Sequence, residues 1–433
     1  MTQRSARSSE RSLLAAEQGD PSSPVGRAPD SEGRRPPPAG TIALLSTLYF
    51  VQGLPYGFQE SALPGFLTKL GVSMAAVGAA SALSWPWALK PLWAPVVDRY
   101  GSRKAWILPL QLLLALACVA AAFSEPSASL TRLIVIVLVM NVLTATQDIA
   151  VDGYAVDRLG KEDLGYGNAA QVVGYKIGML VGGGLLWAWY AELKWQGVFF
   201  AMAACCLFGM AVLSVSREVR PAVADAAEKM SWRELVQRLK AVMALPGTGW
   251  LIAFVATYKM GEALANKMFT PFLVKQRGLE PEVVASWMGT WVMGASLLGS
   301  LFGGVLASRM RLVRAVAAAA AFRVVGLVGQ WALVAGVVAV TRVSVIAIAA
   351  IEHFFAGALT VCMFSLMMSK VDKRIGATHY TLLAAIEVWG KALPALASGV
   401  LVEAVGFANT FLVAVALSVA FLGLAAPMRR AKE

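Results

Sequence analysis

From Thr41 onward the chain is built almost entirely of apolar runs, each about as long as the ~20 residues that an α-helix needs to cross a bilayer. Hydrophobic residues make up 58% of the 433 positions and charged residues only 15%, which excludes an ordinary soluble domain. Because lipid offers no partners to exposed backbone groups, runs of this length predict helices. The runs lie at 42–68, 74–97, 105–123, 131–156, 168–190, 196–215, 248–273, 283–307, 312–338, 343–368, 378–402 and 407–426. We therefore predict an all-α integral membrane protein with twelve transmembrane helices in two six-helix bundles.

Polar stretches divide this plan into domains. The first stretch is rich in Ser, Pro, Gly and Arg, and no apolar core follows its charges, so we expect a disordered cytoplasmic tail and not a signal peptide. The central stretch contains an amphipathic pattern at 231–240 that begins with a capping Ser, which predicts a helix on the membrane surface. The predicted domains are a tail at 1–40, an N-terminal bundle at 41–215, a cytoplasmic linker at 216–247, a C-terminal bundle at 248–427 and a tail at 428–433.

The distribution of Lys and Arg predicts the orientation. Counted by loop, 26 of the 38 basic residues fall on the side that carries both termini, and 6 fall on the other side. Because cytoplasmic loops carry the basic excess, both termini are expected in the cytoplasm, and we expect a multi-pass protein of the cell inner membrane. The formal net charge of +12 then reflects topology and contact with membrane lipids, which argues against a nucleic-acid partner.

Two acids stand inside one apolar run. Asp148 and Asp152 are four residues apart, so a helix places them on one face. A carboxylate in hydrocarbon costs several kcal/mol unless a partner, water or a proton compensates. Lys90 and Lys176 fall at about the same depth of neighbouring runs, so the four side chains could neutralise one another. Alternatively, one carboxylate takes the coupling proton and a lysine meets an anionic solute.

The second half carries a similar set of charges. Glu387 and Lys391 are four apart with the acid first, which is the spacing of a self-neutralising pair. Glu352 and His353 are adjacent, so we expect them to point to different faces and not to form one site. A histidine titrates near neutrality and is a candidate proton carrier. The candidate proton-coupling residues are Asp148, Asp152, Glu352 and His353, and the candidate substrate-binding residues are Glu60, Lys90, Lys176, Lys259, Arg323 and Lys391.

One run also carries a regular series of glycines. Gly174, Gly178 and Gly182 recur every four residues and so share one face of the predicted helix. Small residues on one face let two helix backbones approach closely in a membrane. This spacing predicts tight helix packing in preference to direct contact with a solute.

A charged loop, APVVDRYGSRK at 94–104, follows the second apolar run. It resembles the Gly-x-x-x-Asp-Arg-x-Gly-Arg-Arg signature of the major facilitator superfamily, with Ala94 at the first Gly and Ser102 between the basic residues. The resemblance implies a gating latch of Asp98, Arg99 and Arg103. In such a latch Asp98 accepts hydrogen bonds from neighbouring helix ends when the cytoplasmic side is closed. The second half has Ser308 where the pattern expects Asp, which implies a weaker latch there.

A narrower resemblance rests on four segments, all in the N-terminal half. They are YFVQGLPYG at 49–57, PWALKPLWAPVVD at 86–98, QDIAVDGY at 147–154 and GYKIGMLVGG at 174–183. They are similar to the peptide–acetyl-coenzyme A–drug transporter family, which includes AmpG-type muropeptide permeases and acetyl-CoA transporters. The resemblance implies alternating access, driven by protons in the permease branch. We expect a monomer that takes up a large anionic solute such as a muropeptide, with acetyl-CoA or another acyl-CoA as the alternative.

No motif for chemistry competes with this interpretation. The chain lacks a Gly-x-x-x-x-Gly-Lys-Ser/Thr loop, a Gly-x-Ser-x-Gly elbow and a His-Glu-x-x-His pair, and it has only 2 His. We therefore expect no enzyme, no cofactor and no metal. Two alternatives of another class are a membrane-embedded acyltransferase, for which His379 lacks an evident partner, and a non-transporting sensor that keeps the fold.

Overall fold

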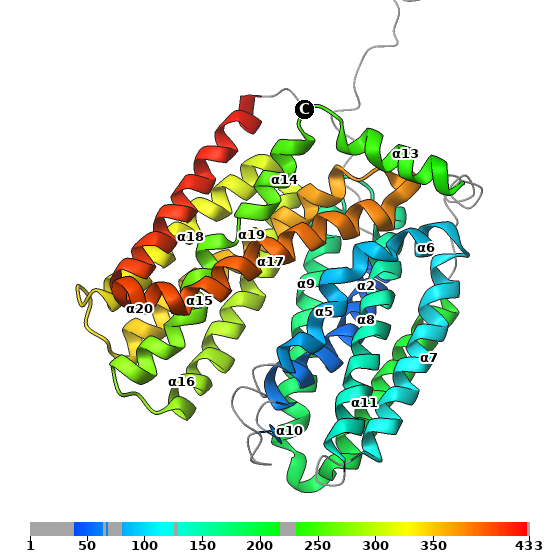
Figure 1. Cartoon of the computed structure of the whole chain (residues 1–433), viewed down its shortest axis with the longest axis horizontal. Helices are drawn as coiled ribbons and strands as arrows, with labels where there is room; N and C mark the ends of the chain where they lie inside the picture. Colours follow the sequence, from blue (N-terminus) through cyan, green and yellow to red (C-terminus); the bar gives the residue numbers. More distant parts are fainter. Residues whose placement is uncertain (1–38, 64–65, 68–79, 125–128, 217–230, 431–433) are drawn as a thin grey trace, which may run out of the picture. The chain divides into compact units, whose positions relative to one another are not determined.

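The computed structural model describes residues 39–63, 66–67, 80–124, 129–216 and 231–430, and within these ranges every regular element is a helix (Figure 1). The tail expected at 1–40 falls almost wholly outside them, and half of the tail expected at 428–433 does; α2 already begins at Ala39, and α20 reaches Arg430. The helices of the first half are α2 (Ala39–Gly57), η1 (Phe58–Ala62), η2 (Ala80–Ser84), α5 (Trp85–Leu89), η3 (Lys90–Leu92), α6 (Ala94–Arg99), α7 (Arg103–Ala122), α8 (Leu130–Arg158), α9 (Leu164–Leu180), η4 (Val181–Leu185), α10 (Leu186–Ala188) and α11 (Tyr190–Val215).

The described parts of the linker and the second half are also built of helices. Their helices are α13 (Trp232–Met243), α14 (Thr248–Thr257), α15 (Met260–Pro271), η5 (Phe272–Gln276), α16 (Pro281–Trp287), η6 (Met288–Val292), α17 (Met293–Arg309), α18 (Leu312–Val334), α19 (Arg342–Ser369), η7 (Lys373–Ile375) and α20 (Gly376–Arg430). Seven segments of the described chain are long and apolar enough to cross a membrane, and an eighth is added if the pair bent by 80° before Thr248 counts as one span. The fold is thus that of a multi-pass membrane protein.

Several of the spans predicted from sequence are broken or joined. The last segment, Lys373–Leu424, has 52 residues, more than twice the ~20 needed for one crossing. It is divided at Gly406, where φ is +80° and only glycine is at ease, and its two arms point in different directions in Figure 1. The span predicted at 248–273 is interrupted between α14 and α15, at Tyr258 and Lys259. The break leaves the carbonyl of Tyr258 free to bond a side chain.

Capping side chains and a glycine turn determine where α7 and α13 begin. Ser102 accepts from the amide of Ala105 and starts α7, directly after Gly101 turns the chain with φ of +71°. The linker helix α13 starts as predicted, because Ser231 and Glu234 form a reciprocal capping box. These turns hold the charged loops at one end of the helices.

The glycine series of α9 packs against α2 as the spacing predicted. A Cβ added to Gly178 would lie 2.1 Å from the carbonyl oxygen of Phe50, and one added to Gly182 would lie 2.1 Å from that of Leu54. Gly174 meets α2 in the same way at Ser46. The two backbones are therefore in contact along several turns, which fixes where the other side chains of α9 point.

The hydrophobic core differs between the two ends of the helices. At the end that carries Asp98, one continuous cluster joins residues from both halves, such as Tyr49, Leu164, Met367 and Tyr380. Away from Asp98, the cores separate into one cluster within the first half and another within the second. The halves are thus packed together at the Asp98 end and are not joined by a common core at the opposite end.

Candidate functional site

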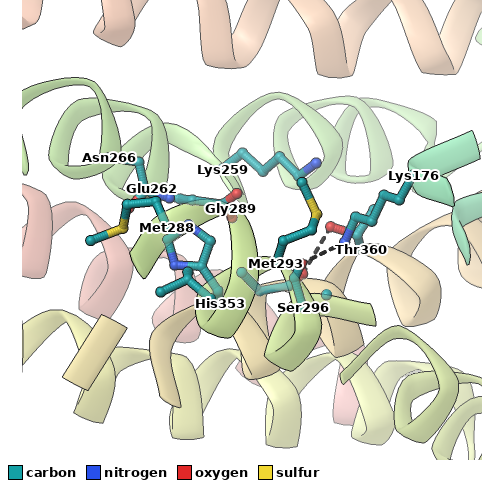
Figure 2. Close-up of a pocket in the computed structure, with 13 residues that line it drawn as sticks. Lys176, Lys259, Glu262, Asn266, Met288, Gly289, Met293, Ser296, His353 and Thr360 are labelled. Atoms are coloured by element: carbon teal, nitrogen blue, oxygen red, sulfur yellow. Dashed lines mark hydrogen bonds between the residues drawn. The ribbon is translucent and has the colours of Figure 1, made fainter. Parts of the chain in front are cut away.

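A cavity of about 460 Å³ lies between α9 of the first half and α15, η6, α17 and α19 of the second (Figure 2). Its volume suits a small-molecule ligand. The wall combines charged, amide, hydroxyl and thioether groups. It is lined by Lys176, Lys259, Glu262, Asn266, Met288, Gly289, Val292, Met293, Ser296, His353, Ala356, Gly357 and Thr360. Three of the predicted substrate and proton residues, Lys176, Lys259 and His353, therefore share one cavity.

Lys176 reaches from α9 to α17. Its Nζ donates to the hydroxyl of Ser296 at 2.6 Å and to that of Ser300 at 3.2 Å. It forms no ion pair with any residue of the described ranges. Of the two alternatives for Lys176, the structure does not show a neutral group with Lys90, Asp148 and Asp152, because α9 turns its side chain toward the second half. A lysine held only by neutral hydroxyls keeps its charge available to a ligand.

Arg323 and Glu262 form a pair beside the break between α14 and α15. Arg323 is fully buried, and its guanidinium donates to Glu262 Oε2 at 2.8 Å and to the carbonyl of Tyr258 at 2.9 Å. It therefore satisfies both a carboxylate and the carbonyl released by the broken helix. Arg323 lies behind the cavity wall and acts on Glu262, whereas Glu262 itself lines the cavity.

Glu387 binds two lysines. The predicted pair with Lys391 is confirmed at 3.2 Å, and Lys259 adds a second ion pair at 3.0 Å. The hydroxyl of Tyr258 lies 3.4 Å from the same carboxylate. The side chain of Lys391 is 42% exposed, whereas Glu387 is buried. Because Lys259 and Lys391 already have an acid, they are less available than Lys176 to an anionic ligand.

The side chains of Glu352 and His353 lie closer together than we expected for adjacent residues of one helix. His353 Nδ1 lies 2.8 Å from Glu352 Oε2 and 3.0 Å from the carbonyl of Ala349, so the expectation of separate sites is wrong. The histidine side chain is long enough to fold back along its helix toward the neighbouring carboxyl group. Glu352 is completely buried and neither of its oxygens accepts a well-formed hydrogen bond, while His353 lines the cavity. The ring thus stands between the cavity and a buried carboxyl group.

The two acids of α8 have different partners. Asp148 pairs with Lys90, and both side chains are buried. Asp152 accepts from the hydroxyl of Tyr49 at 2.8 Å and from the amide of Gln171 at 3.1 Å, and no cation of the described chain pairs with it. Asp148 is therefore neutralised by a lysine, whereas Asp152 is held only by neutral donors.

Sequence reasoning missed several residues that complete these networks. Tyr380 on α20 donates to Gln171 at 3.5 Å, so a chain of hydrogen bonds links Asp152 to the second half. These residues are neutral, and only their position opposite a buried charge identifies them as part of the site: Tyr49, Gln171, Ser296 and Ser300. Glu60 lies apart from these networks; it is exposed, and it accepts from the hydroxyl of Ser84 at 3.4 Å.

Of the predicted latch residues, Asp98 reaches across to the second half. Asp98 is buried and accepts from the backbone amides of Ala377 at 3.1 Å and Thr378 at 2.6 Å, at the start of α20. Arg103 donates to Asp98 at 2.8 Å and to Asp157 at 3.1 Å, and so joins α7 to α6 and α8. The expected geometry of Asp98 is confirmed: an acid of the first half caps a helix of the second.

Arg99 and Ser308, the other two positions of the motif, make different kinds of contact. Arg99 stacks on the ring of Trp232 in the linker helix, with its guanidinium carbon 5.4 Å from the ring centre. Ser308, which replaces the second acid, packs against Gly165 at the start of α9, and its buried hydroxyl has no hydrogen bond within the described chain.

The sequence showed no partner for His379, but the structure gives it one. Its Nδ1 accepts from the backbone amide of Asp372 at 3.2 Å. Among the described residues, no group of three or more His, Cys, Asp or Glu side chains is arranged to hold a metal.

Solved transporters share this arrangement of helices. The Escherichia coli protein FucP, a major facilitator superfamily transporter solved in the outward conformation, aligns with a TM-score of 0.71 at 16% identity, over 90% of this chain and 99% of that one. The human organic anion transporter MFSD10 aligns with a TM-score of 0.69 at 15% identity, over 90% of this chain and 100% of that one. The chain therefore has the fold of these major facilitator transporters.

Sequence relatives narrow the class. The anhydromuropeptide permease of Escherichia coli K12 is 30% identical over 397 residues, which cover 90% of this chain and 80% of the permease. An uncharacterised protein of Haemophilus influenzae is 27% identical over 84% of this chain and 88% of its own length. The family model described as acetyl-coenzyme A transporter 1 matches residues 41–186. The chain belongs to this family of anhydromuropeptide permeases and acetyl-CoA transporters, so it is a transporter and not an enzyme.

Proposed function

We propose that the chain is a secondary active transporter that carries a large anionic solute, such as a muropeptide, together with protons by alternating access. The observation that supports this most directly is Lys176, a cation on the cavity wall whose hydrogen-bond partners are two serine hydroxyls. An ammonium removed from water is unfavourable without a counter-ion, so an anionic group of a solute would complete its environment. Near this centre Lys259, Arg323 and Lys391 would hold the acids of the second half in ion pairs. Lys90 and Glu60, outside the cavity wall, are proposed as secondary contacts of the solute.

A muropeptide is the preferred solute because a relative that is 30% identical over 90% of this chain is named an anhydromuropeptide permease. Acetyl-CoA is the alternative, and the match of residues 41–186 to an acetyl-CoA transporter model favours it. Both solutes are anionic, and an ammonium at Lys176 suits either one. Transport experiments separate the two.

Protons are proposed to couple at Asp152 and at the pair of Glu352 and His353. Asp152 has neutral donors only, so its carboxyl group can change protonation without leaving a lysine unpaired. Asp148 is tied to Lys90, and its protonation would strand a buried ammonium. His353 stands where it can exchange a proton between the cavity and Glu352.

Asp98, Arg99 and Arg103 are proposed to latch the cytoplasmic end. The contacts of Asp98 with α20 and the shared core at that end describe a state closed on this side. Opening would separate Asp98 from the amides of Ala377 and Thr378 and expose the cavity to the cytoplasm. Such a rocking motion is the expected form of alternating access in proteins with two repeated bundles.

The proposed topology has twelve spans in two six-helix bundles, at 41–215 and 248–427, joined by a cytoplasmic linker at 216–247. Both termini would lie in the cytoplasm, with the protein in the cell inner membrane as a monomer. This assignment rests on the excess of Lys and Arg at the Asp98 end. The same residues would contact anionic membrane lipids, and no nucleic acid is proposed as a partner.

Uptake into proteoliposomes tests the proposal. Labelled muropeptide and labelled acetyl-CoA are offered with and without an inward proton gradient. We expect muropeptide uptake that the gradient drives and that Lys176→Met reduces at least tenfold, because a charge-assisted contact is lost. Lys267→Met is the matched control, since this lysine is exposed on α15 and lies outside the cavity wall. Absence of uptake of both solutes under both conditions would overturn the proposal.

A further inference from the structure

His379 is a buried histidine in the first turn of α20, at the Asp98 end of the molecule. Its Nδ1 lies 3.2 Å from the backbone amide nitrogen of Asp372, seven residues earlier in the chain. Because a backbone amide can only donate, Nδ1 is the acceptor and carries no proton. This hydrogen bond therefore exists only while the imidazole is neutral.

Asp372 holds the turn before α20 with three separate groups. Its backbone amide donates to His379, and its Oδ1 accepts from the amide of Arg374 at 3.0 Å and so caps η7. Its Oδ2 accepts from Arg238 of the linker helix α13 at 2.7 Å. The turn at Asp372 thus connects η7, α13 and α20, and the ring of His379 is its side-chain contact with α20.

The same first turn of α20 carries the amides that Asp98 caps. Ala377 and Thr378, which donate to Asp98 at 3.1 Å and 2.6 Å, directly precede His379. All three residues of α20 are buried. Because the ring and the two amides belong to one helical turn, a displacement of His379 also displaces the amides that bond the second half to the first.

A proton on Nδ1 of His379 is incompatible with this arrangement. Both ring nitrogens of an imidazolium are donors, so Nδ1–H would face the amide N–H of Asp372 and the hydrogen bond would be lost. A buried charge is also unfavourable unless it is paired, and the carboxylate of Asp372 is already shared between Arg238 and the amide of Arg374. Proton binding therefore favours conformations in which the ring leaves this contact for water.

The other charged groups around the start of α20 ordinarily titrate outside the range of a histidine. Carboxyl groups have an ordinary pKa near 4, and Lys and Arg stay protonated to above pH 10, whereas an imidazole has an ordinary pKa of about 6.5. These groups are Asp98 on α6, Arg103 on α7, Asp157 on α8, Arg238 on α13, and Asp372, Lys373 and Arg374 in the preceding turn.

We propose that His379 is a proton-sensitive switch of the Asp98 end. The neutral ring ties the turn at Asp372 to α20 and supports the closed state. The protonated ring releases this turn, and with it the linker helix and the cap that Asp98 forms on α20. The switch is separate from the proposed proton coupling, because His379 lies outside the cavity wall. It does not depend on the identity of the solute.

Double electron–electron resonance on the purified full-length protein without solute tests the switch. Spin labels at positions 161 and 311, which are exposed and belong to different halves at the Asp98 end, report the opening. We expect the ratio of open to closed molecules to rise about fivefold to tenfold from pH 7.5 to pH 5.5, because an imidazole with its ordinary pKa changes from mostly neutral to mostly protonated over this range.

His379→Asn should abolish most of this response. The side-chain oxygen of Asn can accept from Asp372 in place of Nδ1 but cannot take the proton, so the ratio should change less than about twofold. The absence of a pH response in the wild type, or an equal response in His379→Asn, would overturn the proposal.

His353→Asn is the matched control, because it removes the other of the 2 His of the chain. Its opening should respond to pH as that of the wild type does. A response that disappears in this variant would place the titrating group in the cavity and contradict the role of His379. Should His379→Asn fail to fold, the control still decides: a response that persists with His379 as the remaining histidine supports the switch, and a flat profile refutes it.

Discussion

The carboxylate of Asp98 accepts a hydrogen bond of 2.6 Å from the backbone amide of Thr378, which lies 280 residues later in the chain. The same carboxylate accepts from Ala377, so it caps the first turn of α20 from the other half of the molecule. An acid at a helix N-terminus satisfies amides that have no partner in the helix and is favoured by the helix dipole. Asp98 therefore stabilises the state in which the two halves meet at this end.

Asp98→Asn should shift the protein toward the state that is open at this end. The amide oxygen still accepts from α20, but the charge is lost, and so is the ion pair with Arg103. A loss of about 1–2 kcal/mol would change the ratio of closed to open molecules by roughly fivefold to thirtyfold. Double electron–electron resonance measures the distance between spin labels at positions 161 and 370, which increases when this end opens.

Lys104→Gln is the control for that experiment. Lys104 belongs to the same charged loop, but it donates to the carbonyl of Ser216 and not to Asp98. Its distance distribution should match that of the wild type. If both variants open alike, the charge of the loop in general governs this end, and if neither opens, the cap by Asp98 does not hold it closed.

The glycine series of α9 and η4 predicts very different effects for two similar Gly→Ala substitutions. A Cβ at position 178 would lie 2.1 Å from the carbonyl oxygen of Phe50, which a backbone cannot avoid without moving. Gly178→Ala should therefore cost about 1–3 kcal/mol of stability, as overpacking does in other cores. Gly184→Ala, where the nearest atom is 3.9 Å away, should be tolerated. Thermal unfolding followed in the same detergent compares them, and similar melting temperatures would show that α2 and α9 can separate freely.

The linker helix bonds to both halves at the Asp98 end. Trp232 stacks under Arg99, and Arg238 donates to Asp372 at 2.7 Å. Both contacts are partly exposed, so each is worth about 0–1 kcal/mol. Arg238→Ala should therefore raise hydrogen exchange in α13 without lowering the melting temperature of the protein measurably. Arg233→Ala is the matched control, because this exposed arginine of the same helix has no hydrogen bond or ion pair with another described residue.

Acid should loosen the start of the same helix. The hydrogen bonds from Ser231 lower the pKa of Glu234 below its ordinary value. A lowered folded pKa means that the contribution of the capping box is complete above the ordinary glutamate pKa, about 4.3, and is lost as pH falls through the lowered value. Hydrogen exchange in the first turn of α13 should thus rise at acidic pH in the wild type and vary less with pH in Glu234→Gln. Identical profiles would mean that the charge of Glu234 does not support the helix start.

Contacts within one helix were predictable from spacing. Glu387 and Lys391 pair as their four-residue separation indicated, and the capping box at Ser231 follows the same logic. In each case the partners are set by helix geometry alone. The charge placement between helices was only partly predictable, because similar depth in the membrane does not determine which way a side chain faces.

Lys176 illustrates what spacing cannot determine. Its depth suggested Asp148 and Asp152 as partners, yet the tight contact of α9 with α2 turns Lys176 toward Ser296 on α17. Similarly, adjacency in sequence suggested that Glu352 and His353 diverge, but a flexible side chain closes the gap. Pairings across helices depend on rotation about each helix axis, which only the packed structure supplies.

The two acids of α8 should therefore respond differently to the same substitution. Asp152→Asn keeps an oxygen that accepts from Tyr49 and Gln171, so the protein should fold as stably as the wild type. Because an amide cannot carry the proton, accumulation driven by a pH gradient should be lost while exchange of solute across the membrane continues. Asp148→Asn instead leaves Lys90 buried without its acid, which should cost about 3–5 kcal/mol.

The double variant Lys90→Met with Asp148→Met distinguishes charge balance from coupling. Replacing both members of a buried ion pair by apolar groups of similar size is often neutral, so this variant should regain the stability that Asp148→Asn loses. Melting temperatures and gradient-driven uptake measured on the three variants give the result. If Asp152→Asn still accumulates solute against its gradient, the coupling proton does not reside on Asp152, and Glu352 with His353 becomes the site to test by the same pair of measurements.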